Sequence, residues 1–178
     1  MKLTTIFVPT ILLAGALAER IHNQKRALED YEEILDTVTA QIDVAGADLN
    51  NYIAGTVPGT VVQDSAAVLV TLINDAAETV TGLDPISVLD ALNLLGPITT
   101  LTNDVDDLTN TLIAAEPNFI SDGLADEVLL TLYDFRDAGE NLRDAITPKV
   151  PAALQSIANS LADQVVADVQ RAIDAYSD

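Results

Sequence analysis

Apolar residues recur every three or four positions along most of this chain. The clearest case is the stretch 84–113, in which two apolar runs, 86–95 and 98–112, flank Gly96 and Pro97. This spacing is typical of α-helices, and a helix that is apolar around much of its circumference should be buried. A proline inside a helix removes a backbone donor and bends or breaks the helix. We therefore predict a central, buried third helix that is kinked or broken at Gly96-Pro97.

The same spacing predicts helices on both sides of this stretch, over 20–53, 60–81, 124–146 and 154–176. No segment shows sustained alternation of apolar and polar residues, so strands are not expected. The connections are short, which favours mostly antiparallel neighbours. The predicted fold class is all-α, a single bundle of about five helices.

Local signals predict where these helices begin and end. Gly55 suits the end of the first helix. The segment 60–63, Thr-Val-Val-Gln, matches a capping box at the start of the second. Asp84 and Pro85 suit the N-cap and the first position of the third helix. The segment 117–123 reads as a turn before the fourth.

The first 18 residues have the pattern of a secretory signal peptide. Lys2 is followed by an apolar run over 3–14 and by Ala16-Leu17-Ala18, which matches a small-x-small cleavage site. The apolar run is too short to span a bilayer. We predict a signal peptide over 1–18 and one domain over 19–178.

Composition narrows the possible partners. The formal net charge is −20, which argues against binding to nucleic acids or to anionic membrane surfaces. The acidic residues are spread along the sequence, so we expect them to form a solvated outer face. There is no cysteine, so no disulfide contributes to stability.

Residues suited to catalysis or metal binding are few. His22 is the only histidine and cysteine is absent, which excludes Cys-His and multi-His metal sites and leaves Ser-His-Asp catalysis without a buried base. The Asp-rich run 103–107 lacks the glycine and the distal glutamate of a calcium loop. Nothing in the sequence places two carboxylates across a sugar cleft, and aromatic platforms for a sugar are missing. We predict a non-enzymatic protein with no metal and no cofactor.

Two segments carry a family resemblance: 90–113, DALNLLGPITTLTNDVDDLTNTLI, and 144–176, DAITPKVPAALQSIANSLADQVVADVQRAIDAY. With them the chain resembles the fungal hydrophobic surface-binding protein A family, which includes the lipid-binding domains of fungal cell-wall galactomannoproteins. The most specific parts are Leu95-Gly96-Pro97 and Lys149-Val150-Pro151. The resemblance implies that 19–178 is a secreted helical domain that adsorbs to hydrophobic surfaces or holds a long-chain fatty acid or similar lipid between its helices.

Localisation and partners follow from this resemblance. The sequence departs from the galactomannoproteins in lacking their Ser/Thr-rich wall-anchoring tail, which favours release into the medium. We expect a secreted, extracellular protein, either free or associated with the cell wall. The expected partner is a fatty acid, another lipid or a hydrophobic solid; cell-wall components and secreted hydrolases are further candidates. The alternative is a structural cell-wall or interaction protein with a solid core and no ligand.

If a ligand cavity exists, its lining should come from the inner apolar stripes near Gly96-Pro97. A fatty-acid carboxylate should avoid the acidic coat, so we add one neutral hydroxyl, that of Ser65. Arg136 and Arg143 are among the few cations, and we expect each to pair with nearby acids on the outside. For each lining residue the alternative is plain core. The predicted lipid-binding residues are Ser65, Leu69, Ile73, Leu92, Leu95, Ile98, Leu101, Leu132, Phe135, Ile157 and Leu161.

Overall fold

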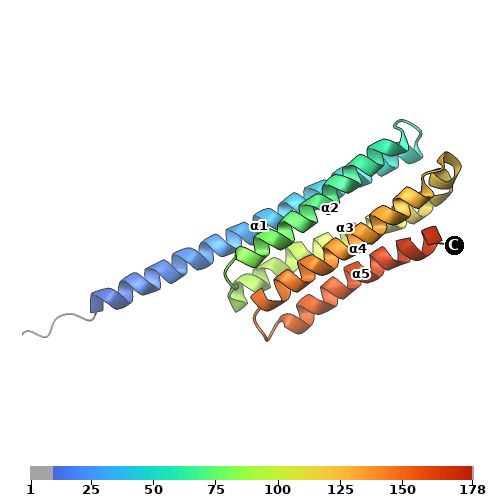
Figure 1. Cartoon of the computed structure of the whole chain (residues 1–178). Coiled ribbons are helices and arrows are strands. Elements are labelled where there is room, and N and C mark those ends of the chain that lie inside the picture. Colours follow the sequence, from blue (N-terminus) through green and yellow to red (C-terminus); the bar gives the residue numbers. More distant parts are fainter. Residues whose placement is uncertain (1–9, 178) are drawn as a thin grey trace, which may run out of the picture.

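The computed structural model describes the backbone of residues 10–177 and the side chains of residues 28–177, and this part of the chain forms helices and no strand. The helices are α1 (Thr10–Ile53), α2 (Gly59–Gly82), α3 (Val88–Asp122), α4 (Ala125–Ile146) and α5 (Gln155–Ser177), with a short 3-10 helix η1 (Thr147–Lys149) after α4. The prediction of an all-α bundle of about five helices is confirmed (Figure 1). Residues 1–9 of the predicted signal peptide lie outside the described residues, and the peptide stays a prediction.

The five helices form a ring instead of surrounding a central helix. α1 packs against α2, α2 against α4, α4 against α5, α5 against α3, and α3 against α1, while α3 and α4 also touch. The predicted central position of the third helix is therefore wrong. Five cylinders about 10 Å wide, arranged in a ring, leave a channel about 7 Å across, whereas four leave about 4 Å. Side chains must fill this wider channel or leave it empty.

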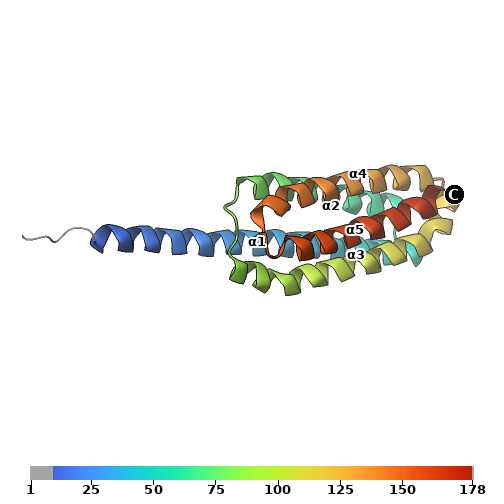
Figure 2. The same cartoon turned by 90° about the horizontal axis from the view of Figure 1, so that it is seen from below.

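Helices that follow one another in the chain are not always neighbours in the ring. Successive helices run in opposite directions (Figure 1), yet α2 packs beside α4 and α3 beside α5, so these pairs are parallel. The pair α1 and α3 is parallel as well. The expected mostly antiparallel packing is wrong because the connection 83–87 carries the chain across the ring from α2 to α3, as Figure 2 shows.

This crossing also explains where α3 begins. The backbone N–H of Ile86 donates to the carbonyl oxygen of Lys149 at 3.1 Å, which holds the connection in place beside η1. The helix therefore starts only at Val88, and the backbone N–H of Asp90 donates to Oγ of the N-cap Ser87 at 3.2 Å. The prediction that Asp84 caps α3 is wrong.

The starts and ends of the other helices agree with the sequence signals only in part. Gly55, with a φ of +71°, follows the end of α1 as predicted. The capping box at 60–63 is wrong, because α2 begins at Gly59 and its N-cap Pro58 makes no side-chain capping bond. A Cβ atom on Gly59 would lie 2.5 Å from Cδ1 of Leu124, so the helix start packs tightly against the α3–α4 connection.

Both prolines of the third predicted helix lie inside α3. The helix continues through Gly96-Pro97, so it is not broken there. It runs on through Pro117 to Asp122, and its C-cap Gly123 has a φ of +72°. The predicted turn over 117–123 is wrong. Gly96, Pro97 and Pro117 are all exposed. Water can therefore bond the carbonyl groups that each proline leaves without a helical donor.

Three aromatic side chains fill one end of the five-helix ring, where the C-terminal ends of α1, α3 and α5 lie. Phe119 is fully buried, and its ring centroid lies 4.4 Å from that of Tyr52 and 6.3 Å from that of Tyr176. The hydroxyl of Tyr52 donates to Asp122 Oδ2, and that of Tyr176 donates to the carbonyl oxygen of Leu112, each at 2.9 Å. We call this part of the core the aromatic end.

Candidate functional site

The opposite half of the ring encloses an elongated apolar cavity. Its volume is about 190 Å³. An engineered protein cavity of about 150 Å³ already stays dry and binds benzene. Most of the lining comes from 31–42 of α1, 73–80 of α2, 91–105 of α3, 135–146 of α4 and 158–169 of α5. We call this space the large cavity and the half of the ring around it the cavity end.

The lining segments show how far the large cavity extends along the bundle. On α4 and the first residue of η1 the lining runs from Phe135 to Thr147, and on α3 it runs from Ala91 to Val105. At a rise of 1.5 Å per residue, these segments are about 18 and 21 Å long. The cavity is therefore a slot of about 20 Å parallel to the helices.

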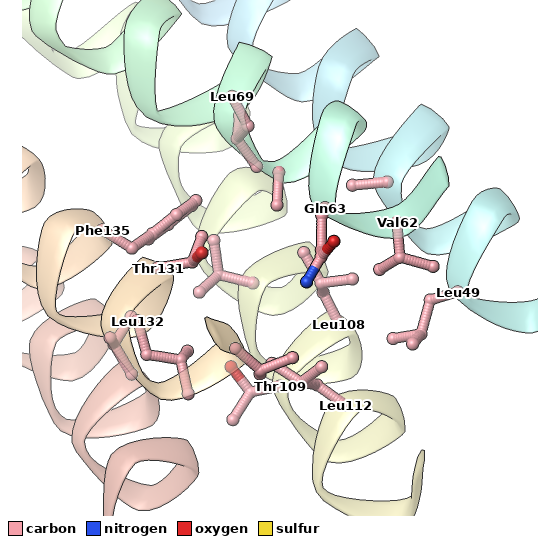
Figure 3. Close-up of a pocket in the computed structure, with 15 residues that line it drawn as sticks. Leu49, Val62, Gln63, Leu69, Leu108, Thr109, Leu112, Thr131, Leu132 and Phe135 are labelled. Atoms are coloured by element: carbon pink, nitrogen blue, oxygen red, sulfur yellow. The ribbon is translucent and has the colours of Figure 1, made fainter. Parts of the chain in front are cut away.

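A second apolar cavity lies further towards the aromatic end. Its volume is about 80 Å³, and we call it the small cavity. Leu69, Leu108 and Leu132 line it, and the ring of Phe135 projects into it from α4 (Figure 3). On α4 the lining spans residues 128–135, which corresponds to about 10 Å along the helix.

Polar side chains of the large cavity gather at its edge near the α4–α5 connection. Arg143, Thr147, Lys149 and Asn159 belong to the lining, and the Thr147 hydroxyl bonds to Oδ1 of Asn159 at 3.4 Å. Lys149 is already engaged, because its Nζ donates to the carbonyl oxygens of residues 81 and 83 at 2.9 and 2.5 Å. It thereby holds the carboxyl end of α2.

Two arginines of α4 line the large cavity while pairing outward. Nη2 of Arg136 lies 3.1 Å from Asp137 Oδ1, and Nη2 of Arg143 lies 3.1 Å from Asp144 Oδ1. The arginine side chains are 32% and 31% exposed, so these pairs are screened by solvent and add little stability. The Arg143 guanidinium can consequently turn towards an anion at the cavity edge, whereas that of Arg136 also lies over the ring of Tyr133, 5.2 Å from its centroid.

Tyr31 lies at the same end of the bundle and stays neutral. Its hydroxyl donates to the carbonyl oxygen of Asp84 at 3.5 Å. Burial, and secondarily the negative charge of Asp84, raises the pKa of Tyr31 to about 12. The large cavity therefore gains no anion from this phenol at neutral pH.

The residues predicted from the sequence are divided between the two cavities. Phe135 borders both of them. Leu69 and Leu132 line the small cavity. The predicted residues that line the large cavity are Ile73, Leu95, Ile98, Leu101, Phe135 and Leu161.

Three predicted residues line neither cavity. Leu92 and Ile157 are 47% and 44% exposed, since each lies one position, or about 100° of helix rotation, from the inward-facing Ala91 and Ala158. Ser65 is buried, but its Oγ donates to the carbonyl oxygen of residue 62 at 3.1 Å. Its own carbonyl oxygen accepts from residue 41 of α1, so Ser65 belongs to the α1–α2 contact.

The sequence reasoning missed the contribution of α1. Five of its side chains line the large cavity, and none was among the predicted lipid-binding residues. The signal was present, because these residues form the apolar stripe of the first predicted helix. They are Tyr31, Ile34, Leu35, Val38 and Ile42.

The described part of the chain holds neither a cluster of metal-binding side chains nor a helix suited to cross a membrane. No three His, Cys, Asp or Glu side chains in that part come together as a possible metal site. Among the described helices, none combines the length and the apolar character needed to cross a membrane.

Known proteins share this sequence pattern and fold. Over its whole length this chain is 31% identical to cell wall mannoprotein 1 of Aspergillus flavus. The chain spans 63% of the length of that protein. The fold matches ligand binding domain 1 of the Penicillium marneffei MP1 protein, complexed with arachidonic acids, with a TM-score of 0.81 at 20% identity, covering 85% of this chain and 99% of that one.

A second domain of the MP1 protein has a somewhat higher sequence identity to this chain. Ligand binding domain 2, in complex with arachidonic acids, matches with a TM-score of 0.72 at 25% identity, over 82% of this chain and 93% of that one. The pattern of the family described as "Hydrophobic surface binding protein A" matches residues 28–148, which is most of the chain. This protein therefore belongs to the hydrophobic surface binding protein A family, as the resemblance of its sequence indicated.

Proposed function

We propose that this protein binds a long-chain fatty acid, or a lipid with a similar acyl chain, in the large cavity. The observation that carries the proposal is an apolar slot of about 190 Å³ that the side chains of the ring leave unfilled. The arachidonic acids in the complexes of the MP1 domains support it. The acyl chain would contact Ile73, Leu95, Ile98, Leu101 and Leu161, which lie in the lining of the slot.

The dimensions of the slot favour a chain of about sixteen carbons. Each step of an extended hydrocarbon chain advances about 1.25 Å for bonds near 1.5 Å and angles near 111°, so sixteen carbons span about 19 Å. This length matches the slot of about 20 Å. Burying fifteen methylene or methyl groups contributes about 12 kcal/mol, and association costs at least about 4 kcal/mol. We expect a dissociation constant on the order of 1 μM.

The carboxylate would lie at the polar edge of the large cavity, at Thr147 and within reach of Arg143 one turn before it. The formal charge of the chain is strongly negative, so the head group needs a cation. Arg143 is held to the cavity edge by α4, with Thr147 and Asn159 as neutral hydrogen-bonding neighbours. Arg136 is two helical turns away, next to Phe135 at the opposite end of the slot.

We propose a non-enzymatic carrier or sequestering protein, because the large cavity holds no nucleophile paired with a base among its described lining residues. Secretion, cleavage of residues 1–18 and either a free or a wall-associated state are also proposed. The similarity to a cell wall mannoprotein supports an extracellular location.

Two measurements test the proposal. Organic extraction of the purified protein followed by mass spectrometry should release a fatty acid, and the extracted protein should bind hexadecanoic acid in calorimetric titration. Arg143→Gln should weaken this binding about fivefold, since a partly exposed charge-assisted hydrogen bond contributes about 1 kcal/mol.

Arg136→Gln is the matched control, since Arg136 is on the same helix and pairs with a neighbouring aspartate in the same way. It should leave the affinity within twofold. Absence of a released lipid together with absence of heat on titration would reject the fatty-acid function. Equal losses in both variants would reject only the head-group position.

Adsorption to hydrophobic surfaces is a second candidate function. Val88, Leu89, Leu92 and Ile157 are between 44% and 68% exposed at the starts of α3 and α5, which are neighbours in the ring. Large exposed apolar side chains of this kind, gathered at one place, are typical of interaction surfaces. The replacement of both Leu89 and Leu92 by Glu should reduce adsorption to polystyrene beads while the affinity for hexadecanoic acid stays unchanged. Unchanged adsorption would contradict this function.

A further inference from the structure

The two cavities are separated by a partition of three side chains. Val105 of α3, Phe135 of α4 and Val169 of α5 are the residues that belong to the lining of both. They come from three different helices and converge on the middle of the ring. The large cavity therefore does not end at a helix or a loop but at side chains, with further apolar space beyond them.

Of these three, Phe135 is the side chain whose removal or rotation would join the cavities. Val105 and Val169 are only 5% and 4% exposed. A valine in a helix has one strongly preferred rotamer. Phe135 is less deeply buried and packs at the edge of two hydrophobic clusters, one at the aromatic end and one around α1 and α2. An aromatic side chain in a helix adopts either of two χ1 values.

We propose that Phe135 sets the longest acyl chain that this protein accepts, by closing the large cavity at the side of the aromatic end. This inference rests on the proposed fatty-acid function. The head group lies at the far edge at Thr147, within reach of Arg143 one turn before it. Thr147 is twelve residues, or about 18 Å, from Phe135, so the terminal methyl group of a sixteen-carbon chain reaches the Phe135 ring. Beyond it the small cavity extends for about 10 Å along α4, room for about eight more carbons in an extended chain.

The consequence is a length limit that a single substitution removes. In the wild-type protein, affinity rises with chain length up to about sixteen carbons and then stops rising, because further carbons find no apolar space. With Phe135→Ala, the ring is lost, the two cavities become continuous, and longer chains gain burial. Each two additional buried methylene groups raise the affinity about tenfold.

The experiment uses straight-chain fatty acids of 12, 16, 20 and 22 carbons to displace a fluorescent apolar probe from the full chain. Leu142→Ala is the matched control, because Leu142 lies two turns further along α4 and lines the large cavity but not the small one. For Phe135→Ala, the affinities for 20 and 22 carbons should rise at least tenfold relative to that for 16. For Leu142→Ala, the wild-type length profile should be kept.

Three outcomes bear on the idea differently. A shift of the length profile in Phe135→Ala but not in Leu142→Ala supports it. The same profile in the wild type and Phe135→Ala, or the same shift in both variants, overturns it while the fatty-acid function stands. If the wild-type protein displaces no probe with any of the four acids, the fatty-acid function itself fails. Circular dichroism of each variant verifies that it is folded.

Discussion

The two ends of the ring are built from the same five helices but are filled differently. At the aromatic end, Phe119 lies between Tyr52 and Tyr176 and is fully buried. At the cavity end, leucine, isoleucine, valine and alanine predominate and leave about 190 Å³ empty. A five-helix ring has a wider channel than a four-helix ring, and aromatic rings are long enough to meet across it. Shorter aliphatic side chains are not.

This contrast gives the scarcity of aromatic residues a structural meaning. The chain has four tyrosines, three phenylalanines and no tryptophan. Three of these seven fill one end, and Phe135 stands between the two cavities. The aliphatic composition of the cavity end thus leaves room for a ligand, while the aromatic end stabilises the fold.

The largest effect is expected when one aromatic ring is removed, either from the aromatic end or from the partition between the two cavities. Phe119→Ala should lower the free energy of unfolding by about 3–5 kcal/mol, since it leaves a cavity among close-packed neighbours. Phe135→Ala should cost less than half as much, because its ring already borders empty space on both sides. Urea unfolding followed by circular dichroism measures both. Equal costs would mean that Phe135 is as tightly packed as Phe119.

A smaller effect is expected when the same side-chain volume is added at two positions of α3. Ala115 is fully buried at the aromatic end, and Ala91 is buried in the lining of the large cavity. Ala115→Leu should cost about 1–3 kcal/mol through overpacking and leave fatty-acid affinity unchanged. Ala91→Leu should cost less than about 1 kcal/mol while lowering that affinity, since the new side chain occupies ligand space. Similar stability losses and unchanged binding in both variants would refute a ligand site at this end.

The smallest effect is expected when a methyl group is added to one glycine at each end of the helix ring. At Gly139, which lines the large cavity, nothing lies within 4 Å of a new Cβ atom, whereas at Gly59 the Cβ would lie 2.5 Å from Leu124 Cδ1. Gly139→Ala should stabilise the protein by about 0.5–1 kcal/mol, because alanine loses less conformational entropy in a helix. Gly59→Ala should bring no gain, since Leu124 must move. Thermal unfolding distinguishes them, and a gain at Gly59 would contradict the tight packing of that end.

Sequence periodicity alone was enough to predict the helices, because it reflects which face of each segment turns away from water. It was less reliable for the cavity lining. On α3, Leu95, Ile98 and Leu101 face the large cavity, but Leu92 is turned outward. A run in which apolar residues cover more than one face does not by itself specify which face is inside.

The order of the helices around the ring was decided only by the tertiary structure. The chain crosses from α2 to α3 through 83–87, where Ile86 bonds to the carbonyl oxygen of Lys149, and this contact joins segments that are far apart in the sequence. Local propensity contains no information about such a partner. Because the crossing closes a ring of five helices without a central one, the wide channel, and with it the large cavity, depends on long-range packing that no single segment encodes.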